Sequence, residues 1–258
     1  MENLRVSTCT ACGEISGNIS LVNFLNNINP NDFIRYCETA SGNKGYAKKN
    51  DKKKRKITNK RKLFMNQGTL IIWDEVEKKL VNTKLFSNKS AKIQMTGILS
   101  KEMGIRILNK IIKYIIDLDI NFVEEKKIFN NNDIKILDFK IVMINCDYDF
   151  RFLINREKLY EDLVDADYYA TYSPDGYPGV NAKYMHNTNN TCGICNCENL
   201  CDGKGNGCGD GECRRVTLAI FQSGKMLCTG GQNFKQVEDS FNFINKFITE
   251  NKNEYILR

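Results

Sequence analysis

Six cysteines fall within a short Gly- and Asn-rich segment, and thiols at this density can hold a metal ion. They follow the spacing C-x2-C-x-C-x3-C-x6-C-x4-C and comprise Cys192, Cys195, Cys197, Cys201, Cys208 and Cys213. Four thiolates bind zinc tetrahedrally, and a loop this polar cannot fold on a core of its own. The sequence therefore predicts zinc at this segment, and six thiols could also hold a small cluster of metals.

Two other interpretations of the cysteine segment stay open, namely a disordered thiol-rich loop and disulfide bonds. The chain has 11 cysteines, and its first residues lack the basic and apolar regions of a signal peptide. In a chain expected to be intracellular, metal or free thiols are favoured over disulfides. His186 is a spare ligand or a plain loop residue, and Cys9 with Cys12 is a lone pair that we expect to pack in the first strand.

The net charge of +7 comes from one segment of the chain. Ten of the fifteen residues 48–62 are basic and one is acidic, so the rest of the chain is slightly acidic. This arm could follow phosphates, act as a nuclear import signal through residues 52–55, or be a solvated insertion. The sequence has no run of about 18 apolar residues, so we expect no membrane span.

One pattern of strands followed by a helix occurs twice. Residues 216–221 and 226–228 are strand-like runs joined through Ser223-Gly224, and apolar residues at helical spacing follow over 234–248. Residues 83–97 precede a second amphipathic helix, 101–116, in the same order. Earlier in the first half, the apolar spacing predicts a helix over 15–28, and residues 69–76 and 79–86 are typical of paired strands. We therefore predict a duplicated unit. The first repeat is 1–121 with a Lys-rich insertion at about 39–66, residues 122–133 connect the halves, and the second repeat is 134–258 with a Cys-rich insertion at about 186–214.

Four runs in the second half resemble the TATA-binding protein family. They read LDFKI at 137–141, DFRF at 149–152, YSPDGYPG at 172–179, and AIFQSGK at 219–225 with Thr229-Gly230. The first half resembles the family more weakly, through residues 6–8, 85–86 and 96–97. The departures and insertions resemble those of a divergent viral member. The resemblance implies an α+β fold, a saddle of two pseudo-symmetric repeats whose curved antiparallel sheet carries helices on its convex side.

The resemblance also implies that the concave sheet binds a widened DNA minor groove, with apolar wedges that kink the duplex. Specificity then rests on the deformability of TA-rich steps more than on base hydrogen bonds. Phe221, Tyr177 and Phe86 match family wedges, and ordinary core packing is the alternative for each. The fourth wedge stays unassigned, because counting back from Phe86 ends near residues 68–69 and only Phe64 lies nearby.

Further positions match family residues that face the groove. Thr96 and Thr229 match threonines that bind minor-groove acceptors, and Leu227 matches an apolar groove residue. The groove-facing asparagines of the family are not matched in register in this chain, and Met143 stands at the position of the second-repeat asparagine. Asn145, two residues along the same strand face, could substitute for it or be a polar strand-end residue.

Lys225 and Lys183 match positions that contact phosphates, and solvated lysines are the alternative. Lys84, Gln94 and Ala219 stand where the family has apolar groove residues. These departures put the tightness of the groove contact in doubt, especially in the first half, so we expect unequal halves with the stronger grip in the second.

Asp175 keeps one of the acids with which the family contacts a TFIIB-like partner. The resemblance places the cysteine segment between the two strands that form the second repeat's stirrup, the loop that straddles DNA and receives this partner. We therefore expect the cysteine loop to enlarge or retune that contact, so that its deletion impairs recruitment of the partner more than DNA binding.

The sequence predicts no enzyme, since one histidine allows no His-dependent triad, and residues 203–211 lack the Lys-Ser/Thr of a phosphate loop. The resemblance implies a general transcription initiation factor that bends TA-rich promoter DNA and recruits a TFIIB-like factor and RNA polymerase. It would act in the nucleus or a cytoplasmic viral factory. The alternatives are a protein-interaction module with weak or lost DNA binding, and an RNA- or single-strand-binding protein that uses the cysteine loop.

Overall fold

A computed structural model describes residues 4–46, 64–88, 90–131, 133–188, 191–199 and 201–257. The Lys-rich arm at 48–62 and Lys89 lie outside these residues. The strands are β1 (Arg5–Ile15), β2 (Ile34–Thr39), β3 (Gly42–Gly45), β4 (Gln67–Asp74), β5 (Lys79–Phe86), β6 (Ala91–Ile98), β7 (Ile136–Asp149), β8 (Ala170–Ser173), β9 (Tyr177–His186), β10 (Arg214–Ile220) and β11 (Lys225–Gly231). The α-helices are α1 (Leu21–Asn27), α2 (Lys101–Asp119), α3 (Arg156–Asp165), α4 (Phe234–Glu250) and α5 (Lys252–Tyr255).

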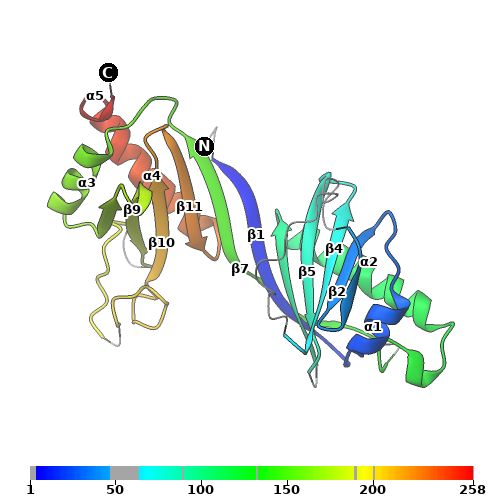
Figure 1. The fold of residues 1–258 in the computed structure, drawn as a ribbon. Coiled ribbons are helices and arrows are strands. Elements are labelled where there is room, and N and C mark those ends of the chain that lie inside the picture. Colours follow the sequence, from blue (N-terminus) through cyan, green and yellow to red (C-terminus); the bar gives the residue numbers. More distant parts are fainter. Residues whose placement is uncertain are drawn as a thin grey trace. The chain divides into compact units, whose positions relative to one another are not determined.

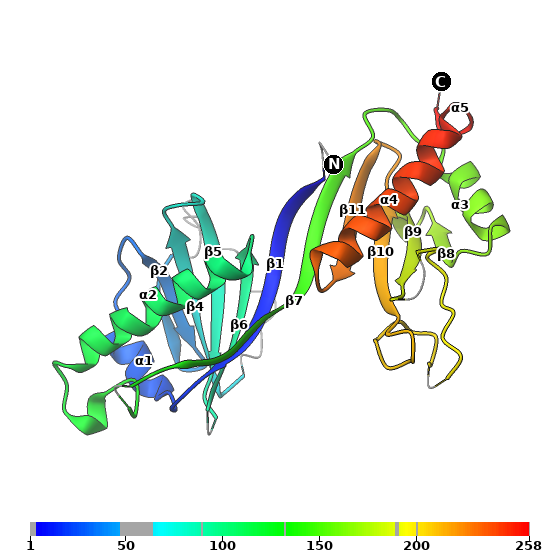
Figure 2. The same cartoon turned by 180° about the vertical axis from the view of Figure 1, so that it is seen from behind.

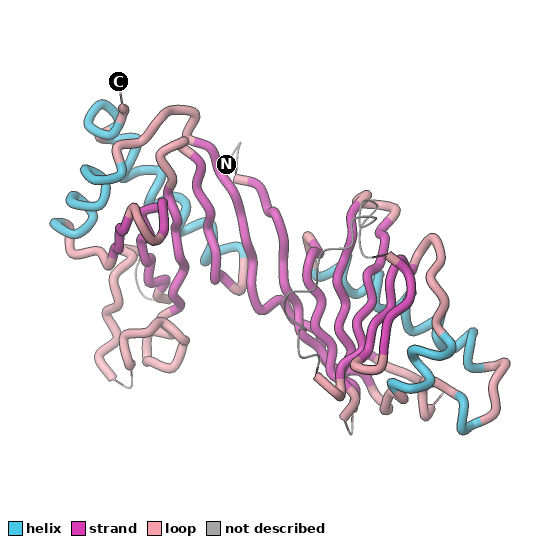
Figure 3. Tube along the Cα trace, in the orientation of Figure 1, coloured by secondary structure: helices cyan, strands magenta, loops and turns pink. Residues whose placement is uncertain are grey.

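Two compact units share these elements. The N-terminal unit is Cys9–Ile141, and the C-terminal unit combines Met1–Thr8 with Val142–Arg258. Strands β1 and β7 each contribute one end to either unit. In both units the strands pair antiparallel and helices pack on the sheet, which confirms the expected α+β class (Figures 1 and 3). The predicted limits of the two repeats stay a prediction.

The N-terminal unit orders its strands β3-β2-β4-β5-β6-β1. Alternation along β5 and β6 directs one set of side chains toward the helices, and the registered pairs Thr83–Met95 and Leu85–Ile93 are buried. Helix α2 lies along this face, as Figure 2 shows. It begins at its N-cap Ser100, whose side chain accepts a hydrogen bond from the Met103 amide.

Phe139, the aromatic residue of the LDFKI run, belongs to the core of the N-terminal unit. Its ring packs against Gly13 of β1 and Gly104 of α2, where an added Cβ would meet ring atoms at 2.9 and 2.6 Å. The two glycines therefore let a strand and a helix close on one ring. A motif in the second half of the chain thus stabilises the unit built mainly from the first half.

Two local predictions for this unit are wrong. The helix predicted over 15–28 begins at Leu21, because Ser20 caps it by accepting from the Asn23 amide, and Ile15 still belongs to β1. The insertion predicted from residue 39 begins later, because Gly42–Gly45 pairs with β2 as β3. Lys44 of this hairpin donates to the carbonyls of Asn26 and Ile28 at 2.8 and 3.3 Å, beside the C-terminus of α1.

The end of α2 is fixed by a buried carboxylate. Asp119 is 1% exposed and accepts the amides of Ile128 and Phe129 at 2.7 and 2.8 Å. Both donors are themselves buried, so the carboxylate satisfies backbone groups that water cannot reach. This contact holds the connection that follows α2 against the N-terminal unit.

The C-terminal unit orders its strands β7-β11-β10-β9-β8. Helix α4 packs on β9, β10 and β11, and α3 packs on β8 and β9 (Figure 2). The buried stripe of α4 agrees with the predicted helical spacing at Val237, Phe241, Ile244 and Ile248, whereas Phe234 is exposed. Within the described residues, no helix is long and apolar enough to cross a membrane.

Candidate functional site

The open face of the C-terminal sheet, opposite α4, carries a row of registered residues. Thr229 on β11 lies opposite Asn145 on β7 and Thr217 on β10, and Leu227 lies opposite Ala219. Leu218 and Cys228, which alternate with these residues, are buried on the helix side. The fold therefore brings together three of the predicted groove residues, Asn145, Leu227 and Thr229. The Asn145 side-chain oxygen is buried and has no hydrogen-bond partner among the described residues.

Lys183 lies on the same face, beside the threonines. Its Nζ donates to the Thr217 hydroxyl at 3.1 Å. Burial, with a smaller effect from the charge of Arg215, lowers the pKa of Lys183. The ammonium group therefore lies along the sheet, where it can meet a ligand that covers the centre of this face.

Tyr177 and Phe221 form an aromatic pair at one end of the β9–β10 ladder. Their ring centroids are 5.8 Å apart with the planes tilted by 55°, and Tyr177 is 40% exposed. Gly179 lies beneath both rings, since a Cβ there would approach Tyr177 to 3.0 Å and Phe221 to 3.1 Å. A residue with a side chain at this position would push the rings away, so the glycine is part of the arrangement.

Arg156, at the start of α3, holds the two turns that carry this pair. Its guanidinium donates to the carbonyl of Pro178 and to the side-chain oxygen of Gln222, the latter at 2.9 Å. It also stacks over Tyr172, 5.3 Å from the ring centroid. The sequence carries no signal for this role beyond a basic residue at a helix start. Asp175, the predicted partner contact, lies in the exposed turn between β8 and β9 next to the pair.

The open face of the N-terminal sheet has a comparable arrangement with different residues. Thr96 on β6 lies opposite Thr10 on β1 and Asn82 on β5, and Gln94 lies opposite Lys84. The Asn82 side-chain oxygen is buried without a hydrogen-bond partner among the described residues, as for Asn145. Asn82 was missed from the sequence, because its position beside Thr96 depends on the register between two strands.

The register of β4 and β5 also identifies a counterpart of Tyr177. Gln67 pairs with Phe86 in the β4–β5 ladder. If the β9–β10 ladder is continued one residue beyond the Val180–Ile220 pair, Gly179 lies opposite Phe221, so Gly179 and Gln67 occupy equivalent positions. Two residues before Gln67 stands Met65, in the turn that precedes β4, and two residues before Gly179 stands Tyr177, the first residue of β9. Met65 is 82% exposed, whereas residues 68–69, where counting from the sequence ended, are buried.

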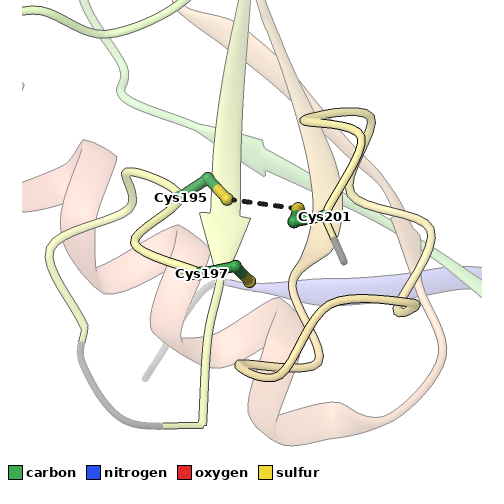
Figure 4. Close-up of side chains that lie close together, drawn as sticks. All are labelled: Cys195, Cys197 and Cys201. Carbon is green, nitrogen blue, oxygen red and sulfur yellow. Dashed lines mark hydrogen bonds between the residues drawn. The ribbon is translucent and has the colours of Figure 1, made fainter. Parts of the chain in front are cut away.

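The six cysteines of the Cys-rich segment separate into two groups. The sulfurs of Cys195, Cys197 and Cys201 all lie within 4.8 Å of one another, an arrangement that could hold a metal ion (Figure 4). Cys213, buried just before β10, shares the side-chain amide of Asn187 with Cys197. Cys192 and Cys208 are exposed, with their thiols against Ile194 and Asn206. Among the described residues, the cysteines form no disulfide bond with one another.

His186 does not join the cysteine cluster as a spare ligand. Its Nε2 lies 3.1 Å from a carboxylate oxygen of Asp239 on α4, and the ring is nearly buried. Cys9 is buried within β1, in agreement with packing, and its thiol donates to the Leu99 carbonyl at 3.5 Å.

The predicted position of the cysteine loop beside the partner-binding turn is wrong. In the antiparallel β9–β10 ladder, His186 pairs with Arg214 at the loop end and Val180 pairs with Ile220 at the other end. Six residues of strand, roughly 20 Å, separate these pairs. The loop leaves the end of β9 (Figure 1). Asp175 and the aromatic pair stand at the beginning of β9, so the two features lie at opposite ends of the ladder.

Comparisons with known proteins agree with this geometry. The family described as transcription factor TFIID (or TATA-binding protein, TBP) matches residues 138–251. The TBP of Methanococcus jannaschii has a similar fold, with a TM-score of 0.52 and 18% identity, over 96% of this chain and 99% of that one. These matches confirm the resemblance seen in the sequence: the chain has the TATA-binding protein fold, and residues 138–251 are similar to that family in sequence.

A viral relative also matches the chain. The chain is 28% identical to a TATA-box-binding protein-like protein of Acanthamoeba polyphaga mimivirus over 198 residues. This match covers 73% of the chain and 48% of the relative, so the chain matches about half of the relative's length. The chain is thus similar in sequence to a viral TBP-like protein.

Proposed function

We propose that this protein is a non-enzymatic transcription initiation factor that binds and bends TA-rich promoter DNA through the minor groove. The observation that carries the proposal is the pairing of Tyr177 with Phe221 at the end of a sheet face that also holds Thr229, Asn145 and Leu227. Apolar wedges at a strand end can enter a base step and open it. A face of small polar and apolar residues can then cover the widened groove between the wedges.

The open faces have the chemistry that a minor groove requires. A·T pairs present only the acceptors of adenine N3 and thymine O2 there, so hydroxyl and amide donors fit them. The C-terminal unit supplies Thr229 with Asn145, and the N-terminal unit supplies Thr96 with Asn82. These donors read A·T against G·C only weakly, so sequence preference would follow the deformability of TA steps.

Wedges in the N-terminal unit complete the proposal. Phe86 ends β5, and the exposed Met65 occupies the place that Tyr177 holds beside Phe221. Methionine is among the apolar side chains that enter base steps. Because Met65 is flexible and Lys84 and Gln94 replace apolar groove residues, we expect a weaker grip in this half than in the C-terminal unit.

Phosphate contacts should show in the salt dependence of binding. Lys225 is exposed at the start of β11, next to the turn that bears Phe221. Replacing Lys225 with Ala should weaken binding about equally for all duplexes and lower the slope of log K against log salt by about 1. Lys246→Ala on α4, where the side chain is 74% exposed, is the matched control and should leave the slope unchanged. Equal slopes for both variants would remove Lys225 from the interface.

Recruitment of further factors forms part of the proposal. Asp175 stands in an exposed turn beside the aromatic pair, where a basic surface of a TFIIB-like factor could reach it while DNA is bound. RNA polymerase would follow through that factor. Asp175→Asn should therefore weaken the ternary complex with such a factor, measured by a supershift titration, more than it changes the affinity for DNA alone.

A gel-shift titration over several salt concentrations tests the proposed function against its alternatives. The probes are a TA-rich duplex, a scrambled duplex of equal composition, and the corresponding single strand. The proposal predicts preference for the TA-rich duplex with a bend in the bound state. Preference for the single strand would favour nucleic-acid binding by the cysteine loop, and no binding to any probe would favour a protein-interaction module.

A further inference from the structure

We infer that Cys195, Cys197, Cys201 and Cys213 bind one zinc ion as a tetrathiolate centre, and that Cys192 and Cys208 are not ligands. The inference concerns a site remote from the proposed DNA contacts, so it does not depend on the proposed function. The spacing of the six cysteines in the sequence does not separate ligands from non-ligands. The inference selects four of the six as ligands.

The spacing of three sulfurs fits three corners of a zinc tetrahedron. Bonds of about 2.3 Å from zinc to sulfur give sulfur–sulfur edges of about 3.8 Å. The sulfurs of Cys195 and Cys201 are 3.5 Å apart, and those of Cys195, Cys197 and Cys201 all lie within 4.8 Å of one another (Figure 4). Cys213 offers the fourth sulfur, because it shares the side-chain amide of Asn187 with Cys197. No disulfide joins any of the four.

Hydrogen bonds from neighbouring amides suit the charged form of these thiols. The side-chain amide of Asn187 donates to the sulfurs of Cys213 and Cys197, at 3.5 and 3.9 Å, and the backbone amide of Gly203 donates to Cys201 at 3.4 Å. Such N–H groups orient thiolate ligands and offset part of their negative charge. The three contacts involve three of the four proposed ligands.

The loop packs closely around two of the proposed ligands. At Gly209 a Cβ would lie 2.8 Å from the Cys197 sulfur and 2.8 Å from the Cys201 Cβ. A side chain at 209 would therefore displace two ligands. At Gly203 and Gly207, in contrast, a Cβ would meet nothing within 4 Å.

The metal would give a polar loop the folding energy that it lacks. The described residues between His186 and Cys213 are mostly polar or glycine, and Cys213, at 1% exposure, is the ligand anchored at the start of β10. A structural zinc site can supply such a segment with most of its stability. The centre would fix the loop to the end of the β9–β10 ladder, where Thr188, Thr191 and Glu212 border a pocket with Gln236 of α4.

The inference is tested by titrating Co²⁺ into the full chain after zinc removal under reducing conditions. A tetrathiolate site should bind one Co²⁺ per chain, with the visible bands of tetrahedral cobalt and intense sulfur-to-cobalt charge transfer. Cys195→Ser, Cys197→Ser, Cys201→Ser and Cys213→Ser should each weaken binding by at least tenfold and reduce the charge-transfer intensity. The matched controls Cys192→Ser and Cys208→Ser should bind Co²⁺ as the parent chain does.

The metal content of the chain as purified under reducing conditions provides a second measurement. Native mass spectrometry should find one zinc ion per chain, lost with Cys201→Ser, a substitution at a partly exposed position that spares the buried end of β10. Cys213→Ser alone is weaker evidence, because its site is buried and the variant can misfold. Two or more metal ions per chain, iron in place of zinc, no metal at all, or a loss caused by Cys192→Ser or Cys208→Ser would each overturn the inference.

Discussion

Phe221→Ala should abolish most of the bending of a TA-rich duplex and weaken its binding by about 30-fold, or about 2 kcal/mol. The ring is one half of the pair with Tyr177, 5.8 Å between centroids, at the end of β10. Its removal leaves a single wedge at this base step, so the cost of opening the step is no longer offset. Bending is measured by energy transfer between dyes at the two duplex ends, and affinity by the shift titration.

Two matched substitutions make this result specific. Phe234→Ala removes a ring of the same size that is 57% exposed at the start of α4, on the helix side of the same unit, and should change neither bending nor affinity. Phe86→Ala should cause a smaller loss than Phe221→Ala, because the N-terminal unit offers Met65 and polar groove residues in place of an aromatic pair. Unchanged bending in Phe221→Ala, or equal losses for Phe221 and Phe234, would contradict the proposed wedge.

Much of the fold could be predicted because strand alternation and helix periodicity are local signals. The prediction for residues 79–86 has the same bounds as β5, and the helix predicted from residue 101 begins there. Predictions failed where the local spacing of apolar residues favoured one element but pairing with a strand distant in the sequence formed another. The stripe from Ile15 to Ile28 has helical spacing, yet β6 recruits Ile15 into β1 through its pairing with Ala91.

The same distinction between local signals and distant contacts applies to the residues of the candidate site. Phe221, Tyr177 and Thr229 were found from motifs that lie within one stretch of chain. Asn82, Met65 and Arg156 were not, because their positions depend on strand register or on a helix end that reaches two separate turns. Likewise, the spacing of the cysteines predicts a metal, but the choice of ligands depends on how the loop folds back on β10.

Asp119→Ala should destabilise the N-terminal unit by about 3–5 kcal/mol, the largest stability loss that we expect from a single polar substitution here. The carboxylate accepts two buried backbone amides, those of Ile128 and Phe129, at 2.7 and 2.8 Å. Alanine leaves both donors without an acceptor and without access to water, so the desolvation cost of two N–H groups is no longer offset. Asp119→Asn keeps the shape of the side chain, but its NH2 group faces one of the two backbone N–H donors. This variant should therefore recover at most part of the lost stability.

Asp117→Ala, two residues before Asp119 and on the exposed side of α2, is the matched control and should change stability by less than about 0.5 kcal/mol. Denaturant unfolding gives the difference in free energy, and hydrogen exchange at the amides of Ile128 and Phe129 locates it. Both amides should lose protection in Asp119→Ala and keep it in Asp117→Ala.

If protection at these amides survives in Asp119→Ala, water or another acceptor replaces the carboxylate and the two hydrogen bonds do not hold the end of α2. If protection is lost, binding to the TA-rich duplex should weaken as well, because Thr96 and Asn82 lie in the unit that Asp119 stabilises.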